Sequence, residues 1–200
     1  STIHNNQGYG IHATNCKVSI YNSQITNTLN DCIAIIGGET YINHCTIAQF
    51  YPFDGNRGAA FSFANNKNGT AYPITACTIR NSIVTGYAED VVMAYISDTI
   101  NSAFKFDHCL LRTPEISDTV RCSNIIWENT TDTIATGHKN FQLIDSEKLK
   151  YDFRLTEISK AVNTADATTS LPSDRNATPR DSKPDMGCYE YVDTASEKNQ

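Results

Sequence analysis

The hydrophobic pattern of the first 135 residues repeats, and it changes phase at a fixed point in each repeat. Four segments share one order: apolar, any residue, Asn or His, Ser or Cys, any residue, apolar. In the first of them, alternation of apolar and polar positions around Val18 and Ile20 predicts a β-strand. The alternation is broken after Ile20, since the next apolar residue is Ile25, so the strand must bend between them. The four segments are residues 20–25, 42–47, 79–84 and 106–111.

Each bend is predicted to lie at the Asn or His of the motif. Among non-glycine residues, Asn and His are enriched at positive φ, the conformation that a sharp corner requires. The corner residues should therefore stack in one column, with both histidines in structural rather than catalytic roles. They are Asn22, His44, Asn81 and His108.

The repeated motif predicts an all-β fold of stacked units. The motifs begin 22, 37 and 27 residues apart, which indicates a constant unit with loops of variable length. A short apolar segment precedes each motif, at 10–13, 32–35, 60–63 and 91–94, and residues 120–129 contain a shifted fifth copy. Such units form a parallel β-solenoid, here of about five coils. A β-sandwich would show hairpin signals between strands, and the one Asn-Gly pair, at 68–69, lies in a loop.

The cysteines fit this stacking better than a disulfide framework. Cys45 and Cys109 occupy the same motif position, two coils apart. At about 4.8 Å per coil they would be separated by about 9–10 Å. A disulfide needs Cα atoms within about 7 Å, so we expect both thiols to be free and buried.

The carboxy-terminal quarter of the chain has no such period. Residues 141–191 follow neither a 3.6-residue nor a 2-residue repeat. We expect a division into coils at 1–136 and an irregular capping segment at 137–200, packed on the last coils. Specifically, we predict that Phe153, Leu155 and Tyr189 contact residues 125–127. Gly187 should adopt a conformation that other residues resist, and Arg154 or Arg180 should pair with a carboxylate of this segment.

Composition excludes several partners. The net charge is −6, only 19% of residues are charged, and no Lys/Arg run is present, so nucleic acid is not an expected partner. No apolar run reaches the roughly 18 residues of a transmembrane segment. The first residues do not form a signal peptide, and we expect a piece or processed form of a longer protein. At an open amino-terminal end, unpaired strand edges should meet further coils or another copy of the chain.

Several motifs of the last 75 residues resemble the carboxy-terminal part of the bacterial choice-of-anchor Q family. The motifs are IIWEN (125–129), NFQLID (140–145), YDFRLTEISKAVNTAD (151–166), DRNATPR (174–180) and DMGCYEY (185–191). The family's usual residues differ from those found here at Lys160, Asn163, Ala165, Ala177 and Cys188. The resemblance implies a right-handed parallel β-helix of the pectin-lyase-like type, exported to the bacterial cell surface or beyond. It implies no particular reaction.

Candidate binding residues lie in the longest loops. Long loops on a rigid scaffold commonly carry binding residues, and Tyr and Phe rings beside Asp, Arg and Asn suit a polysaccharide. We predict a non-catalytic structural or glycan-binding module, or alternatively part of a polysaccharide lyase or glycoside hydrolase. Three or more carboxylates or lysines converging near these loops would favour the enzyme. The sequence indicates no catalytic residue, metal site or cofactor. The candidates are Tyr51, Phe53, Asp54, Arg57, Tyr72, Glu89 and Asp90.

Overall fold

The computed structural model describes residues 1–128, 131–132 and 134–193 of the chain. Over these residues the protein is all-β, with no α-helix and one short 3₁₀ turn, η1 (Gly137–Asn140). The strands are β1 (Thr2–His4), β2 (Ile11–Thr14), β3 (Lys17–Tyr21), β4 (Gln24–Thr26), β5 (Ile33–Ile36), β6 (Gly38–Asn43), β7 (Thr46–Gln49), β8 (Phe61–Ala64), β9 (Asn66–Lys67), β10 (Thr70–Ala71), β11 (Ile74–Gly86), β12 (Val92–Tyr95), β13 (Ser102–Leu111), β14 (Cys122–Trp127), β15 (Phe141–Asp145) and β16 (Lys150–Leu155).

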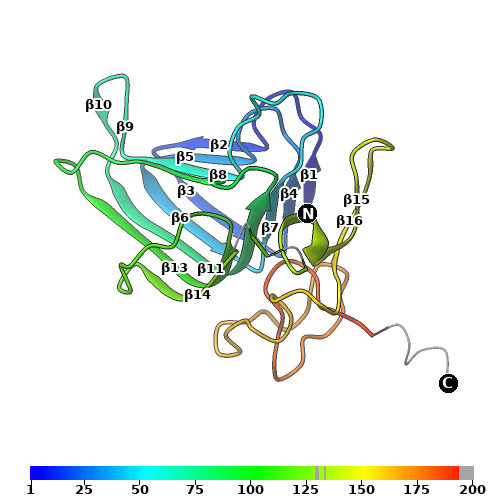
Figure 1. Cartoon of the computed structure of the whole chain (residues 1–200). Coiled ribbons are helices and arrows are strands. Elements are labelled where there is room, and N and C mark those ends of the chain that lie inside the picture. The colour runs from blue at the N-terminus through cyan, green and yellow to red at the C-terminus, as the bar shows by residue number, and fades with distance from the viewer. Residues whose placement is uncertain (129–130, 133, 194–200) are drawn as a thin grey trace.

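Two parallel sheets pair each strand with its counterpart in the next repeat. The larger has the order β1-β4-β7-β11-β13-β14, with β3 and β6 joined to it through β11. The smaller has the order β12-β8-β5-β2. In Figure 1 the β2–β5–β8 sheet lies above β3 and β6, while β1, β4 and β7 stand on the side nearest the carboxy-terminal segment. The interior between these walls is filled by fully buried side chains such as Ile33, Ile42, Phe61 and Ile79.

The predicted corners are confirmed. Asn22, His44, Asn81 and His108 have φ values of 43°, 50°, 46° and 48°. Parallel pairing sets them in one column, since the residues on either side of each corner are partners in neighbouring repeats. Asn124, with φ 54°, adds a fifth corner in the shifted repeat. Each corner turns the chain from one wall to the next, as from β3 into β4.

The cysteine prediction is also confirmed. Cys45 and Cys109 are free and fully buried. Between them in the stack lies Ser82, which pairs with Cys109 and whose hydroxyl accepts a hydrogen bond from the Cys45 amide at 3.0 Å. Burial raises the pKa of each thiol to about 12. These sulfurs are therefore small core groups and not reactive thiolates.

The carboxy-terminal segment lies along the flank of the stack, which bears out the predicted contact with Ile126 and corrects those with Ile125 and Trp127. Phe153, Leu155 and Tyr189 join a second core cluster with Ala48, Ile83 and Leu110 of the larger sheet and with Phe50, which follows β7. Ile126 touches this cluster, whereas Ile125 and Trp127 pack against the interior core instead. The segment covers the flank because Ile83 and Leu110 point away from the interior and are apolar. The last residues, 194–200, lie outside the described part of the chain.

The amino-terminal residues begin a partial repeat. Strand β1 pairs in parallel with β4, from Thr2↔Gln24 to His4↔Thr26. The apolar residues Ile3, Ile11 and Val18 of this end are only partly buried against the core. Self-association at this end stays a prediction. Among the described residues, no helix has the length and apolar character needed to cross a membrane.

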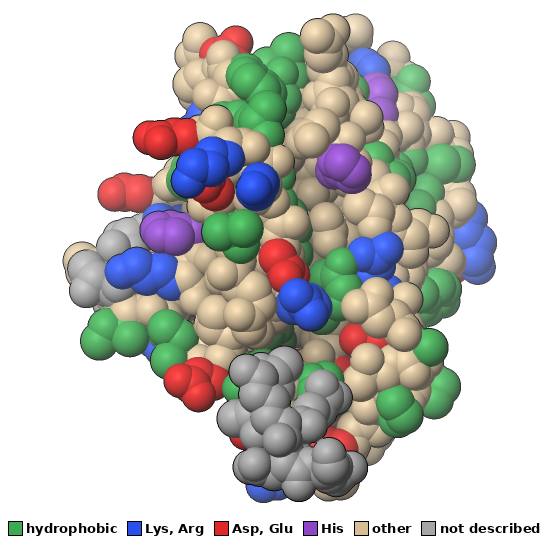
Figure 2. Space-filling model, turned by 90° about the vertical axis from the view of Figure 1, so that its right-hand side faces the viewer, with side chains coloured by type: hydrophobic (Ala, Val, Ile, Leu, Met, Phe, Trp, Pro, Cys, Tyr) green, Lys and Arg blue, Asp and Glu red, His purple; other side chains and the backbone are tan. Residues whose placement is uncertain are grey.

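The surface nearest the carboxy-terminal segment is not strongly charged. Figure 2 shows mostly uncharged polar side chains and backbone on this face, with charged and hydrophobic side chains in small groups between them. This agrees with the low charged fraction of the chain, 19%. Electrostatic attraction to a highly charged partner therefore has little support on this face.

Candidate ligand-binding groove

A groove of about 380 Å³ lies between the 50–60 loop and the 87–91 segment, over the starts of strands β8 and β12. Parallel stacking places it there, because the chain enters each strand of the smaller sheet at the same edge. Asp31 stands two residues before β5 and Asp90 two residues before β12, with Ala59 in the corresponding position of the repeat between them. We call this site the strand-entry groove. Its lining includes Asp31, Arg57, Tyr87, Asp90, Met93 and Tyr95.

Asp31 is held in place by two donors from the loop and strand above it. One carboxylate oxygen accepts the Ala59 amide at 2.7 Å, and the other accepts the Ser62 hydroxyl at 2.5 Å. The loop approaches so closely that a Cβ on Gly58 would lie 2.4 Å from the Asp31 amide nitrogen and from a carboxylate oxygen. Glycine is thus needed at position 58 for the loop to lie against Asp31.

Tyr87 forms a rigid aromatic surface beside the groove. Its ring packs edge-on against buried Phe50, with centroids 4.9 Å apart, and its hydroxyl hydrogen-bonds to Ser146 in the β15–β16 hairpin. The Arg57 guanidinium lies over the ring, with its carbon 5.3 Å from the centroid. Arg57 also donates to the Asp54 carbonyl at 2.9 Å. Arg57 is therefore committed to holding the loop against Tyr87.

Asp90, just before the edge strand β12, and Tyr95, at the end of that strand, also line the groove. One Asp90 carboxylate oxygen accepts the Val92 amide at 3.1 Å, which fixes the turn into β12. Tyr95 is 61% exposed, a large ring left open to solvent at the groove's margin. Its exposure and flat face give the groove a surface on which a ring-shaped ligand can stack.

A buried ion pair supports the 87–91 segment from below. Arg112 donates to the Ala88 carbonyl at 2.6 Å and lies 3.5 Å from the Glu128 carboxylate. Glu128 in turn accepts the Thr85 hydroxyl at 2.6 Å and the Gly137 amide at 2.7 Å. Because every contact of this pair is to the protein framework, its role is to position the groove's wall.

The sequence-predicted candidates are divided by the structure. Arg57 and Asp90 line the groove. Tyr51 is buried, and exposed Phe53 packs edge-on against it in the same loop. Like Tyr51 and Phe53, the remaining three lie outside the groove's lining. Asp54 caps its own loop by accepting the Asn56 amide, and Glu89 is exposed to solvent. Tyr72 follows the β9–β10 hairpin at the opposite end of β8 (Figure 1).

Sequence reasoning missed Asp31 and Tyr95 and did not place Tyr87 among the candidates. A signal for Asp31 existed: Asp31-Cys32-Ile33 and Asp90-Val91-Val92 are the same approach to a strand, two repeats apart. Tyr95 carried no such signal, because whether the end of β12 is covered depends on a neighbouring repeat.

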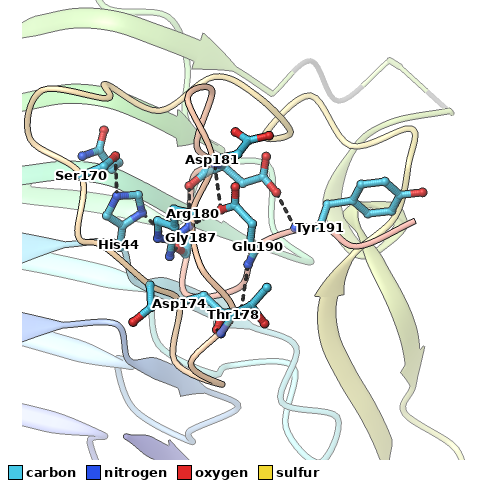
Figure 3. A network of polar contacts seen from close by, with 12 residues as sticks. His44, Ser170, Asp174, Thr178, Arg180, Asp181, Gly187, Glu190 and Tyr191 are labelled. Carbon is cyan, nitrogen blue, oxygen red and sulfur yellow. Dashed lines mark hydrogen bonds and ion pairs between the residues drawn. The ribbon is translucent and has the colours of Figure 1, made fainter. Parts of the chain in front are cut away.

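A second polar cluster, in the carboxy-terminal segment, is structural. Figure 3 shows Arg180 between Glu190 and Gly187. Its guanidinium lies 2.7 Å from the Glu190 carboxylate and donates to the Gly187 and Asp185 carbonyls at 3.0 and 3.2 Å. Arg154 pairs with Asp152 at 2.5 Å, so both arginines form the predicted carboxylate contacts. With these arginines engaged by the protein itself, the cluster is better suited to fixing the segment than to binding an anion.

His44 connects this cluster to the corner column. Its Nε2 lies 2.9 Å from the Ser170 hydroxyl and its Nδ1 lies 3.3 Å from the Gly187 carbonyl (Figure 3). Burial, together with the nearby Arg180 charge, lowers the His44 pKa to about 3. A histidine that is neutral at physiological pH and so weakly basic is poorly suited to general-base catalysis.

Within residues 1–128, 131–132 and 134–193, no three His, Cys, Asp or Glu side chains are arranged to hold a metal ion. No protein-family model matches the chain, and no curated protein matches it significantly.

Proposed function

We propose that this protein is a right-handed parallel β-helix module that binds a glycan without transforming it. Support for the solenoid comes from the register: strands of each repeat pair in parallel with those of the next in two sheets, and corner residues recur at each bend. A parallel crossover between strands of one sheet is almost always right-handed. On this proposal residues 1–136 are the coils and 137–200 an accessory segment.

The observation that carries the binding proposal is the strand-entry groove. It combines two tyrosine rings, Tyr87 and Tyr95, with the carboxylates of Asp31 and Asp90 at the edge of a rigid parallel sheet. Sugar rings present C–H faces that pack on aromatic rings and hydroxyls that donate to carboxylates. Binding sites of this kind are concave and contain a few well-placed polar groups.

A carbohydrate-active enzyme, either a polysaccharide lyase or a glycoside hydrolase, is the second candidate. The two carboxylates on one groove favour it, since glycoside hydrolysis uses a pair of carboxyl groups. Both oxygens of Asp31, however, already accept hydrogen bonds from Ala59 and Ser62. Among the described residues, two carboxylates and no lysine line the groove, fewer than the three convergent groups that would favour catalysis. Binding is therefore the better supported function.

We also propose that the protein is exported and acts at the bacterial cell surface or in the extracellular space. The support is the resemblance of the motifs in residues 125–191 to a family of exported proteins. Burial raises the thiol pKa of five of the seven cysteines to about 11 or 12. Most thiols would therefore resist oxidation in such a compartment. Fractionation of a native producer, with immunodetection of the protein, tests this part.

Binding is tested by affinity electrophoresis and calorimetry of the intact chain against neutral, amino and acidic polysaccharides. Replacing Tyr95 by alanine should weaken binding about 5- to 30-fold, because a stacked ring contributes on the order of 1–2 kcal/mol. Tyr21→Ala is the matched control, since Tyr21 is 47% exposed outside the groove and packs on Tyr41. Release of reducing ends or unsaturated sugars in the same samples would establish the enzyme instead. An equal loss of affinity in Tyr95→Ala and Tyr21→Ala, or no binding of any polysaccharide by the wild type, would contradict the proposed function.

A further inference from the structure

We propose that the strand-entry groove selects sugars that carry no negative charge, and so excludes uronate and sulfated glycans. This inference depends on the proposed glycan-binding function and adds the substrate class to it. It is drawn from the charges and hydrogen bonds of the groove itself.

The groove's charged lining is dominated by carboxylates. Asp31 and Asp90 line it, and Arg57 is its single basic residue among the described parts of the chain. Two further acidic residues, Asp54 and Glu89, are exposed next to the lining segments. An anionic ligand would therefore approach more negative than positive charge.

Arg57 offsets this charge only in part, because it is one cation beside two carboxylates. Its guanidinium lies over the Tyr87 ring and donates to the Asp54 carbonyl within its own loop. A ligand carboxylate that took Nη1 as one arm of a forked pair would displace the Asp54 carbonyl. Releasing Arg57 would also free the loop that holds Asp31 through the Ala59 amide.

The groove nevertheless offers acceptors to a ligand that brings hydroxyl or ammonium donors. Asp90 uses one carboxylate oxygen for the Val92 amide, and its other oxygen has no hydrogen bond to any residue in the described chain. A neutral sugar can donate a hydroxyl hydrogen there while its ring lies on Tyr95. An amino sugar can donate an ammonium hydrogen to the same oxygen. Neutral and amino sugars therefore both belong to the class that the groove is proposed to bind.

Like charges at short range repel one another, and the repulsion is stronger where salt does not screen it. The groove's preference should therefore depend on ionic strength in a predictable direction. Any residual binding of an acidic glycan should weaken as salt is lowered, the opposite of what a basic, anion-binding groove would show.

The test compares the intact chain with Asp90→Asn. The asparagine keeps an oxygen for the Val92 amide but removes the charge. Glu89→Gln is the control, because it makes the same change at the neighbouring exposed position outside the lining. The ligands are a neutral glucan, a neutral mannan, chitosan, polygalacturonate and alginate, titrated at about 20 and 150 mM salt, near Debye lengths of about 20 and 8 Å.

We expect the wild type to bind at least one neutral or amino polysaccharide more than tenfold tighter than either acidic one. Asp90→Asn should reduce that ratio at least threefold, while Glu89→Gln should leave it within twofold. Tighter binding of polygalacturonate or alginate, strengthened at low salt, would overturn the charge selection but preserve glycan binding. Binding of no polysaccharide would overturn the selection together with the proposed function.

Discussion

The stacked repeats and the carboxy-terminal segment are held in their conformations by different means. In the repeats, parallel backbone pairing and interior apolar columns recur from one unit to the next. Residues 156–193 form no strand, and side chains with specific partners fix their course, as Asp174 does by accepting the Thr178 and Glu190 amides. A repeat can thus be specified by a period, whereas the segment that covers it must be specified contact by contact.

The corner column joins these two regions. Asn22 donates to the Ser173 carbonyl at 2.8 Å, His44 lies 2.9 Å from the Ser170 hydroxyl, and Asn81 accepts the Asp166 amide at 2.8 Å. The same residues adopt positive φ within the stack. Asn22, His44 and Asn81 therefore have two functions: they bend the strands, and their side chains dock the segment on the flank.

Removing the carboxy-terminal segment should have the largest effect on the protein. Deleting residues 141–191 would expose Phe50, Ile83 and Leu110, which are fully buried now. Each such side chain contributes about 1.5–3 kcal/mol by burial, so we expect an aggregating or unfolded product. Size-exclusion chromatography and thermal melting measure this. A soluble truncated chain with an unchanged Tm would show that the flank does not need its cover.

Removing a single buried aromatic ring from the flank should also lower the free energy of unfolding strongly. Phe50→Ala should reduce the free energy of unfolding by about 3–5 kcal/mol, because it leaves a cavity beside Phe141 and Phe153. Phe53→Ala, in the same loop but 66% exposed, should change it by less than about 0.5 kcal/mol. Urea unfolding of both variants measures the difference. Equal effects would place Phe50 outside the core.

Gly187 tests how closely the segment approaches the stack. Its φ is 93°, as predicted for a glycine-specific conformation, and a Cβ there would lie 2.8 Å from Ile83 and 2.9 Å from Thr46. Gly187→Ala should therefore cost about 2–4 kcal/mol through strain and overpacking. Gly69→Ala is the control, with φ 78° and nothing within 4 Å, and should cost only about 1 kcal/mol. If chemical denaturation gives the two variants equal stability, the segment does not lie against Ile83.

The buried His44 should make docking pH-dependent. Its folded pKa of about 3 lies below the ordinary value of 6.5, so the unfolded chain binds the extra proton. The stability that neutral His44 contributes is thus present above pH 6.5 and is lost as pH falls towards 3. The loss amounts to about 2 kcal/mol at pH 5. Burial raises the Asp185 pKa to about 6, and this group acts in the opposite direction, losing stability as pH rises from about 4 to 6.

Two variants separate these effects in unfolding measurements at pH 7.5 and 5. His44→Asn retains a residue that tolerates positive φ, and it should lose about 2 kcal/mol less than wild type on acidification. Asp185→Asn should lose more than wild type. Parallel pH dependence in all three proteins would mean that neither group titrates abnormally in the folded chain.

Sequence pattern predicted the stack because its physical requirements recur. The Asn or His at each corner and the alternating apolar residues before it were visible four times. The position of the carboxy-terminal segment could not be predicted from the pattern, because docking through Arg180, Gly187 and Tyr189 involves contacts that are made only once each. One signal was available: the adjacent apolar pairs 83–84 and 110–111 place one residue on each face of a strand, as strands buried on both faces do.

The candidate site was predictable only in part. Arg57 and Asp90 were recognisable from loop composition, and the position of Asp31 before its strand matches that of Asp90. Tyr72 could not be separated from them, because loops on both ends of β8 have similar aromatic and polar residues. Which end forms a groove is decided by how loops from different repeats pack, as the Arg57–Tyr87 contact shows.

Lateral docking of the carboxy-terminal segment is tested most directly by a double-mutant cycle between Tyr189 and Gln24, 165 residues apart. The tyrosine hydroxyl donates to the Gln24 side-chain oxygen at 2.8 Å, reaching the first repeat. Tyr189→Phe, Gln24→Ala and the double variant should show a coupling energy of about 0.5–1.5 kcal/mol in urea unfolding. Additive effects, with coupling below about 0.3 kcal/mol, would contradict lateral docking and favour a segment confined to the end of the stack.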